Sequence, residues 1–139
     1  MQNELLEAEL SRSIVAVFFD VYNYFGYGLS ERISAGALAY ELRDRGHLVS
    51  RELVVDVRYK DRHVATQRLD MVIDDALVVE IKSTEKLSPA DRLQLINYIR
   101  ATKFEVGLLL HFGPAPRFER FIDSPKKDFH GRIRGPSGV

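Results

Sequence analysis

The stretch from Arg68 to Lys82 constrains the fold most, because apolar and polar residues alternate on both sides of a short polar turn. This alternation predicts two antiparallel strands joined as a hairpin. A three-residue loop at 74–76 gives three apolar cross-strand pairs, which are Ile73 with Leu77, Met71 with Val79, and Leu69 with Ile81. Side chains two residues apart share a face, so these six predict one core-facing side of a sheet.

The same register gives the opposite side of the hairpin a different character. Its pairs are Val72 with Val78, Asp70 with Glu80, and Arg68 with Lys82. Like charges directly opposite in a sheet repel, so the two carboxylates favour a cation between them, most simply a divalent metal with oxygen ligands. The alternative is a solvated strand face with an ordinary surface ion pair between Glu80 and Lys82, which contributes little.

Length and composition limit the remaining possibilities. The 139 residues fit one domain, expected over 1–123, followed by a basic flexible tail at 124–139. With no cysteine there is neither a disulfide framework nor a thiolate site, which suits the cytoplasm. Lys plus Arg and Asp plus Glu both number 20, which argues against strong non-specific binding to nucleic acid. No apolar run is long enough to span a bilayer, and the four histidines share no metal-ligand spacing.

Periodicity predicts the other elements in the order helix, helix, three-strand meander, helix, strand, with a last edge strand. Helices are expected at 3–25, 30–45 and 89–102, and strands at 48–59, 63–73, 77–82, 104–112 and 117–122. The run at 104–112 is almost continuously apolar, which is typical of a strand buried on both faces. Because a helix precedes it, this strand can lie parallel to its neighbour.

Two of the helices carry polar residues with possible functional roles. Glu31 lies in the first turn of the helix at 30–45. It either interacts favourably with the helix dipole or is the third carboxylate of a site. Gln94 and Tyr98 are four residues apart, so they project from one face of the helix at 89–102.

This ordered set of motifs resembles the PD-(D/E)XK nuclease superfamily, and within it the small GxxExxY family. The matching segments run from about 14 to 122 and include Gly28-Leu29-Ser30-Glu31, Arg68-Leu69-Asp70, Val79-Glu80-Ile81-Lys82 and Gln94-Leu95-Ile96-Asn97-Tyr98. The resemblance implies an α/β fold with a restriction-endonuclease-like core, in which helices flank a mixed sheet containing the antiparallel meander. Two positions depart from the family names: Ser34 replaces the GxxExxY tyrosine, and Leu69 replaces the proline of the superfamily motif.

The resemblance also implies roles for individual residues. Asp70, Glu80 and the backbone carbonyl of Ile81 would hold Mg²⁺ or Mn²⁺, and Glu31 would complete the ligand shell. Lys82 would orient or activate the attacking water, or stabilise charge on the phosphate.

Gln94 and Tyr98 are implied to lie beside the scissile strand. Arg68, as the predicted cross-strand neighbour of Lys82, would add to a patch that attracts the substrate phosphate. The sequence thus predicts a metal-dependent nuclease acting on DNA, with RNA as the alternative substrate.

Two alternatives remain open at this point. One is a nuclease-like fold used as a nucleic-acid-binding or regulatory subunit, with weak or lost cleavage; the other is an interaction module whose charged strand face is merely solvated. A homodimer through the apolar N-terminal helix is a further expectation.

Overall fold

The computed structural model describes residues 7–123, so the predicted tail at 124–139 lies outside the described residues. Within this range, three helices and five strands follow one another as predicted. They are α2 (Ala8–Phe25), α3 (Glu31–Asp44), β1 (Val49–Tyr59), β2 (Arg62–Ile73), β3 (Leu77–Lys82), α4 (Pro89–Arg100), β4 (Val106–Phe112) and β5 (Pro116–Ile122). Each predicted element is present, with its ends shifted by a few residues at most among those described.

The strands form one five-stranded sheet in the order β1-β2-β3-β4-β5. Strands β1, β2 and β3 are an antiparallel meander, β3 and β4 are parallel, and β5 returns antiparallel to β4. The parallel step is possible because α4 carries the chain back across the sheet between β3 and β4. The predicted α/β architecture with a mixed sheet is therefore confirmed.

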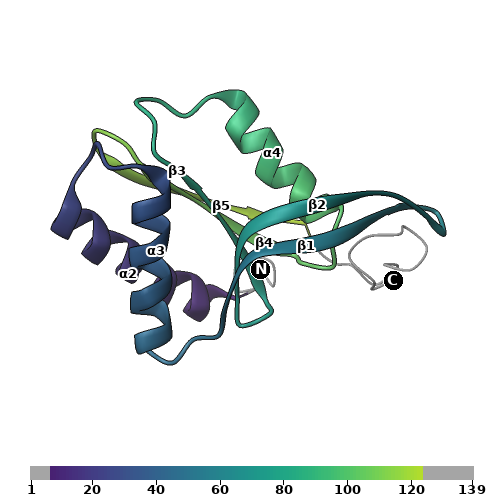
Figure 1. The fold of residues 1–139 in the computed structure, drawn as a ribbon, viewed down its shortest axis with the longest axis horizontal. Coiled ribbons are helices and arrows are strands. Elements are labelled where there is room, and N and C mark those ends of the chain that lie inside the picture. The colour runs from purple at the N-terminus through teal and green to yellow at the C-terminus, as the bar shows by residue number, and fades with distance from the viewer. Residues whose placement is uncertain (1–6, 124–139) are drawn as a thin grey trace.

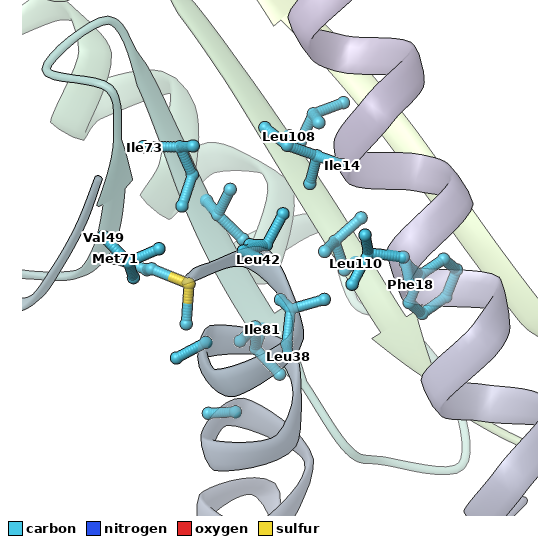
Figure 2. Packing of buried hydrophobic residues seen from close by; sticks show 14 of the residues in the cluster. Ile14, Phe18, Leu38, Leu42, Val49, Met71, Ile73, Ile81, Leu108 and Leu110 are labelled. Carbon is cyan, nitrogen blue, oxygen red and sulfur yellow. The ribbon is translucent and has the colours of Figure 1, made fainter. Parts of the chain in front are cut away.

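Helices cover both faces of the sheet, α2 and α3 on one side and α4 on the other (Figure 1). On the first side, Leu38 and Leu42 of α3 lie near Met71 and Ile81, as Figure 2 shows. On the second side, residues of α4 including Leu95 pack over Val78 and Leu109 of the sheet. Every residue of β3 except Lys82 is buried, so β3 is the central strand of a two-sided core.

The apolar stripe predicted on the N-terminal helix packs against its own sheet. Ile14, Val17 and Phe18 of α2 are fully buried, and Phe18 meets Phe112 of β4 edge to face. A dimer through this helix stays a prediction, and its contacts would have to use side chains such as Tyr24, which is 84% exposed.

The hairpin of β1 and β2 turns over partway along its length, so that the same set of alternate residues changes from one face of the sheet to the other. Met71 belongs to the cluster beneath α2 and α3, but Leu69 belongs to the cluster beneath α4. On the neighbouring strand, Glu52 has φ 51, a left-handed conformation that is rare for a residue with a side chain. The prediction that Leu69 shares a face with Ile81 is therefore wrong, because the alternation of faces is interrupted at this point. Beyond it, the hairpin extends away from the rest of the sheet (Figure 1).

We expect Leu38→Ala to lower the free energy of unfolding by about 2–5 kcal/mol, because it leaves a cavity where α3 meets the sheet. Leu93→Ala is the matched control: Leu93 also lies on a helix but is 52% exposed, so the change should stay within about 0.5 kcal/mol. Urea unfolding measures both. Equal losses in the two variants would contradict this assignment of the core.

Candidate active site

The hydrogen-bonded ladder between β2 and β3 stops one residue before Asp70. The paired residues are Ile73 with Leu77, Val72 with Val78, and Met71 with Val79, as the three-residue loop predicts. The next two predicted charged pairs, Asp70 with Glu80 and Arg68 with Lys82, are not part of the ladder. Instead, the Asp70 carboxylate accepts a hydrogen bond from the backbone N–H of Ile81, with Oδ2 3.2 Å from the nitrogen.

The side chain of Asp70 therefore supplies the hydrogen-bond acceptor that a backbone carbonyl of β2 would supply in a regular ladder. This keeps the Ile81 N–H satisfied while β2 diverges from β3. A cavity lies beside Asp70 at this place, and Glu80 is not part of its lining.

Glu80 is the central group of the site. It carries a carboxyl group, and only 3% of the residue's surface is exposed to solvent. Burial, the negative charge of Asp70 and a hydrogen bond with that carboxyl together raise the pKa of Glu80 to about 8, against the opposing charge of Lys82. Its Oε1 atom is buried and has no hydrogen-bond partner in the described part of the chain. The interpretation of Glu80 and Lys82 as an ordinary surface ion pair is thus wrong, and the two carboxyl groups do come together.

Lys82 is held by α4. Its Nζ donates to Oε1 of Gln94 at 3.0 Å, and Nε2 of Gln94 donates to the hydroxyl of Tyr98 at 2.7 Å. The prediction that Gln94 and Tyr98 share one helix face is confirmed. Burial raises the pKa of Tyr98, and the charges of Glu80 and Asp70 add to this effect, so the hydroxyl lies in the field of both carboxylates.

The start of α4 adds a negative charge beside Lys82. Ser88 and Asp91 form a capping box, in which Oδ2 of Asp91 accepts from the Ser88 N–H at 2.9 Å. Oδ1 of the same carboxylate lies 3.9 Å from Nζ of Lys82. Asp91 therefore caps the start of α4 and also helps to orient Lys82.

Glu31 approaches from the first turn of α3. Partial removal of its carboxyl from water raises its pKa, and so does the charge of Asp70, whereas the charge of Lys82 and a Ser83 backbone hydrogen bond lower it. Within residues 7–123, however, no three His, Asp or Glu side chains are grouped closely enough to form a ready-made metal site.

A cavity of about 340 Å³ opens beside these groups. Its lining residues are Glu31, Arg32, Ala35, Arg51, Glu52, Asp70 and Ile81. Sequence reasoning missed Arg51 and Glu52 as residues of this cavity. A signal for Arg51 existed, because it occupies an inward position of the alternating pattern, between Val49 and Leu53.

Arg68 lies outside this cavity lining. Its side chain is 65% exposed and forms an ion pair with Glu52, with 3.3 Å between NH1 and Oε1. It pairs across the sheet with Val54 of β1 rather than with Lys82.

His111 supports the loop that follows Lys82. It is 4% exposed, and its Nε2 lies 2.7 Å from the backbone carbonyl oxygen of Thr84. Because a carbonyl only accepts, Nε2 must carry the proton. His111 therefore has a structural role close to the end of β3.

Comparison with known proteins agrees with this geometry. A family model described as the PD-(D/E)XK nuclease superfamily matches residues 8–121, which is most of the chain. Searches of curated proteins and of solved structures found no match. The five-stranded mixed sheet with flanking helices is consistent with the restriction-endonuclease-like fold of that superfamily. Among the described residues, no helix is long and apolar enough to cross a membrane.

We expect the metal-free protein to lose stability as the pH rises from about 4.5 to about 8. In this interval folded Glu80 keeps its proton while the unfolded chain releases it, so the unfolded state binds fewer protons and stability falls with pH. Urea unfolding in EDTA across this range measures the effect. Glu80→Gln should flatten the decline and exceed the wild type in stability at pH 9.

Glu9→Gln on α2 is the control, because Glu9 is exposed and lies outside the site. It should keep the wild-type profile. Parallel curves for the wild type and Glu80→Gln would contradict the assignment.

Proposed function

Because the chain belongs to the PD-(D/E)XK nuclease superfamily, we propose that it is a divalent-metal-dependent nuclease that hydrolyses phosphodiester bonds of DNA, with RNA as the alternative substrate. The observation that carries this proposal is the buried Glu80 beside Asp70, with Lys82 held next to them by Gln94. A merely solvated strand face would not bury a carboxyl against another carboxyl.

The donor set suits a hard divalent cation. The unpartnered Oε1 of Glu80 and the raised pKa of this carboxyl are both what a site lacking its positive charge would have. Asp70, Glu80 and the Ile81 carbonyl would hold Mg²⁺ or Mn²⁺, with Glu31 at the edge of the shell. Oxygen ligands favour these ions, and Mg²⁺ usually keeps several of its waters.

A bound ion of this kind activates a water as a nucleophile and stabilises charge on phosphate oxygens. The protein's own contribution is to position the reacting groups. Gln94 fixes Nζ of Lys82, and Asp91 lies close to the same ammonium group. In this proposal Lys82 orients the attacking water or the phosphate, and Tyr98 keeps Gln94 turned towards the lysine. Arg68, exposed at the edge of the site, is proposed to attract the substrate phosphate.

One feature favours a second candidate function. Within the superfamily we propose that the chain belongs to the GxxExxY family. The position of the tyrosine in that motif is occupied by Ser34, a small and buried residue of α3. A chain that lacks this tyrosine could use the same site as a nucleic-acid-binding or regulatory subunit with weak or lost cleavage.

We expect Mn²⁺ titration calorimetry at pH 7 to show binding that is lost in Asp70→Ala and in Glu80→Ala. Since Glu80 has a pKa of about 8, binding at pH 7 should also release about one proton. The apparent enthalpy should then change with the ionisation enthalpy of the buffer, and this dependence should disappear at pH 9. Asp75→Ala is the matched control, because Asp75 is an exposed carboxylate of the hairpin loop paired with Lys103. Loss of binding in that control as well would contradict the assignment.

We expect metal-dependent cleavage when the protein is incubated with linear, circular and single-stranded DNA and with RNA, with and without Mg²⁺. Asp70→Ala and Lys82→Ala should each lower the rate by about 10²-fold or more, since each removes a group that acts directly on the reaction. Gln94→Ala should lower it less, because it only frees Nζ of Lys82. Lys103→Ala, a lysine outside the site, is the control.

The outcomes separate the two candidate functions. Cutting that depends on metal but survives both Asp70→Ala and Lys82→Ala would refute the mechanism. Metal binding without cutting of any substrate would favour the binding-subunit alternative.

A further inference from the structure

Arg51 occupies an unusual position on β1. It pairs across the sheet with Met71, one residue from Asp70, and it lines the cavity that Asp70 and Ile81 also line. The residue is only partly exposed, and its Nε atom is buried without a hydrogen-bond partner among residues 7–123. Buried guanidinium N–H groups are normally paired, so an Nε held without an acceptor requires an explanation.

The cavity contains carboxylates, yet they are not used to satisfy Arg51. Glu52 forms its ion pair with Arg68, and Asp70 accepts from the Ile81 N–H. Across residues 7–123, no carboxylate oxygen lies within ion-pairing distance of Arg51. A cation that faces a shared cavity and keeps an unpaired donor is suited to an anion that enters from outside.

We propose that Arg51 binds a non-bridging phosphate oxygen of the nucleic-acid backbone inside this cavity, an inference that rests on the proposed nuclease function. The planar guanidinium presents paired N–H donors whose spacing matches two oxygens of a phosphate. Phosphate also suits the location, because the scissile group has to lie beside Asp70. The charges of Asp70 and Glu31 would repel it, and Arg51 would add to Lys82 and the proposed metal ion in offsetting them.

The other arginines of this region are less suited to the inner position. The side chain of Arg68 is 65% exposed, already paired with Glu52, and outside the cavity lining. Arg32 lines the cavity but is an exposed residue in the first turn of α3. Arg51 is the one of the three that combines a position in the lining with a buried, unpaired donor.

The test compares three variants of the full chain. Arg51→Met keeps an apolar stem but removes the guanidinium, and Arg51→Lys keeps the charge without the planar donor pair. Arg12→Met is the matched control, because Arg12 is exposed on α2 and lines a separate cavity next to β5. Fluorescence anisotropy with end-labelled duplex and single-stranded DNA gives Kd in Ca²⁺ over a salt series. Cleavage in Mg²⁺ gives kcat/KM, and thermal unfolding gives Tm.

We expect Arg51→Met to raise Kd about tenfold and to reduce the slope of log K against log salt by about one, as the loss of one phosphate contact requires. Arg51→Lys should retain the salt slope but lose part of the affinity and of kcat/KM. Arg12→Met should change Kd less than about twofold, as expected of a cation that contacts no phosphate. The Tm of Arg51→Met should equal or exceed that of the wild type, because a buried unpaired donor has been removed.

The outcomes distinguish failure of this inference from failure of the proposed function. A wild-type protein that neither binds nor cuts any nucleic acid overturns both. A wild type that binds, with Arg51→Met equal to it in Kd and salt slope, overturns only the role of Arg51. If Arg51→Met does not fold, Arg51→Lys decides: reduced kcat/KM at the wild-type Tm supports the role, and unchanged kcat/KM overturns it.

Discussion

The rest of the structure depends on keeping the carboxyl group of Glu80 out of water beside a second carboxyl group. Glu80 lies on β3, the strand that is covered on both faces. A buried carboxyl favours its protonated form, and Asp70 strengthens this preference, which is why the pKa of Glu80 reaches about 8. A positive charge supplied at this point would reverse the preference. The hydrophobic packing of α2, α3 and α4 is thus also what makes the site attractive to a cation.

The interruption of the sheet at Asp70 lets this carboxyl line a cavity, while Glu80 stays buried. Had the ladder between β2 and β3 continued, Asp70 would have formed a regular backbone pair and the two strands would have remained closed. Instead its side chain binds the Ile81 N–H, and the hairpin turns over at Glu52 on the adjacent strand. A left-handed backbone costs free energy for any residue other than glycine, and such costs are commonly found at functional sites. The cavity lined by Arg51, Asp70 and Ile81 lies at this interruption.

Local sequence patterns predicted the elements and most of the site. The polar turn at 74–76 sets the register of Met71 with Val79, and helical spacing placed Gln94 and Tyr98 on one face. The errors concern Leu69 and Arg68, and they share one cause. Alternation assigns faces only while a strand continues regularly, and no local signal in Glu52 marks it as the residue that would adopt positive φ.

Arg51 was missed for a related reason. Its position in the alternating pattern was inward, but a charged residue at an inward position is usually treated as an exception to the pattern. Only the three-dimensional arrangement brings it to the same cavity as Asp70.

The central claim is that Asp70 and Glu80 are arranged to share a divalent cation. Crystals of the wild-type protein soaked in Mn²⁺ at pH 8 or above, measured at a wavelength where manganese scatters anomalously, would locate the ion directly. This arrangement of Asp70 and Glu80 predicts an anomalous peak within bonding distance of both carboxylates and of the Ile81 carbonyl. A peak elsewhere only, or an ion-free site in which Glu80 stays protonated against Asp70 at saturating Mn²⁺, would contradict it.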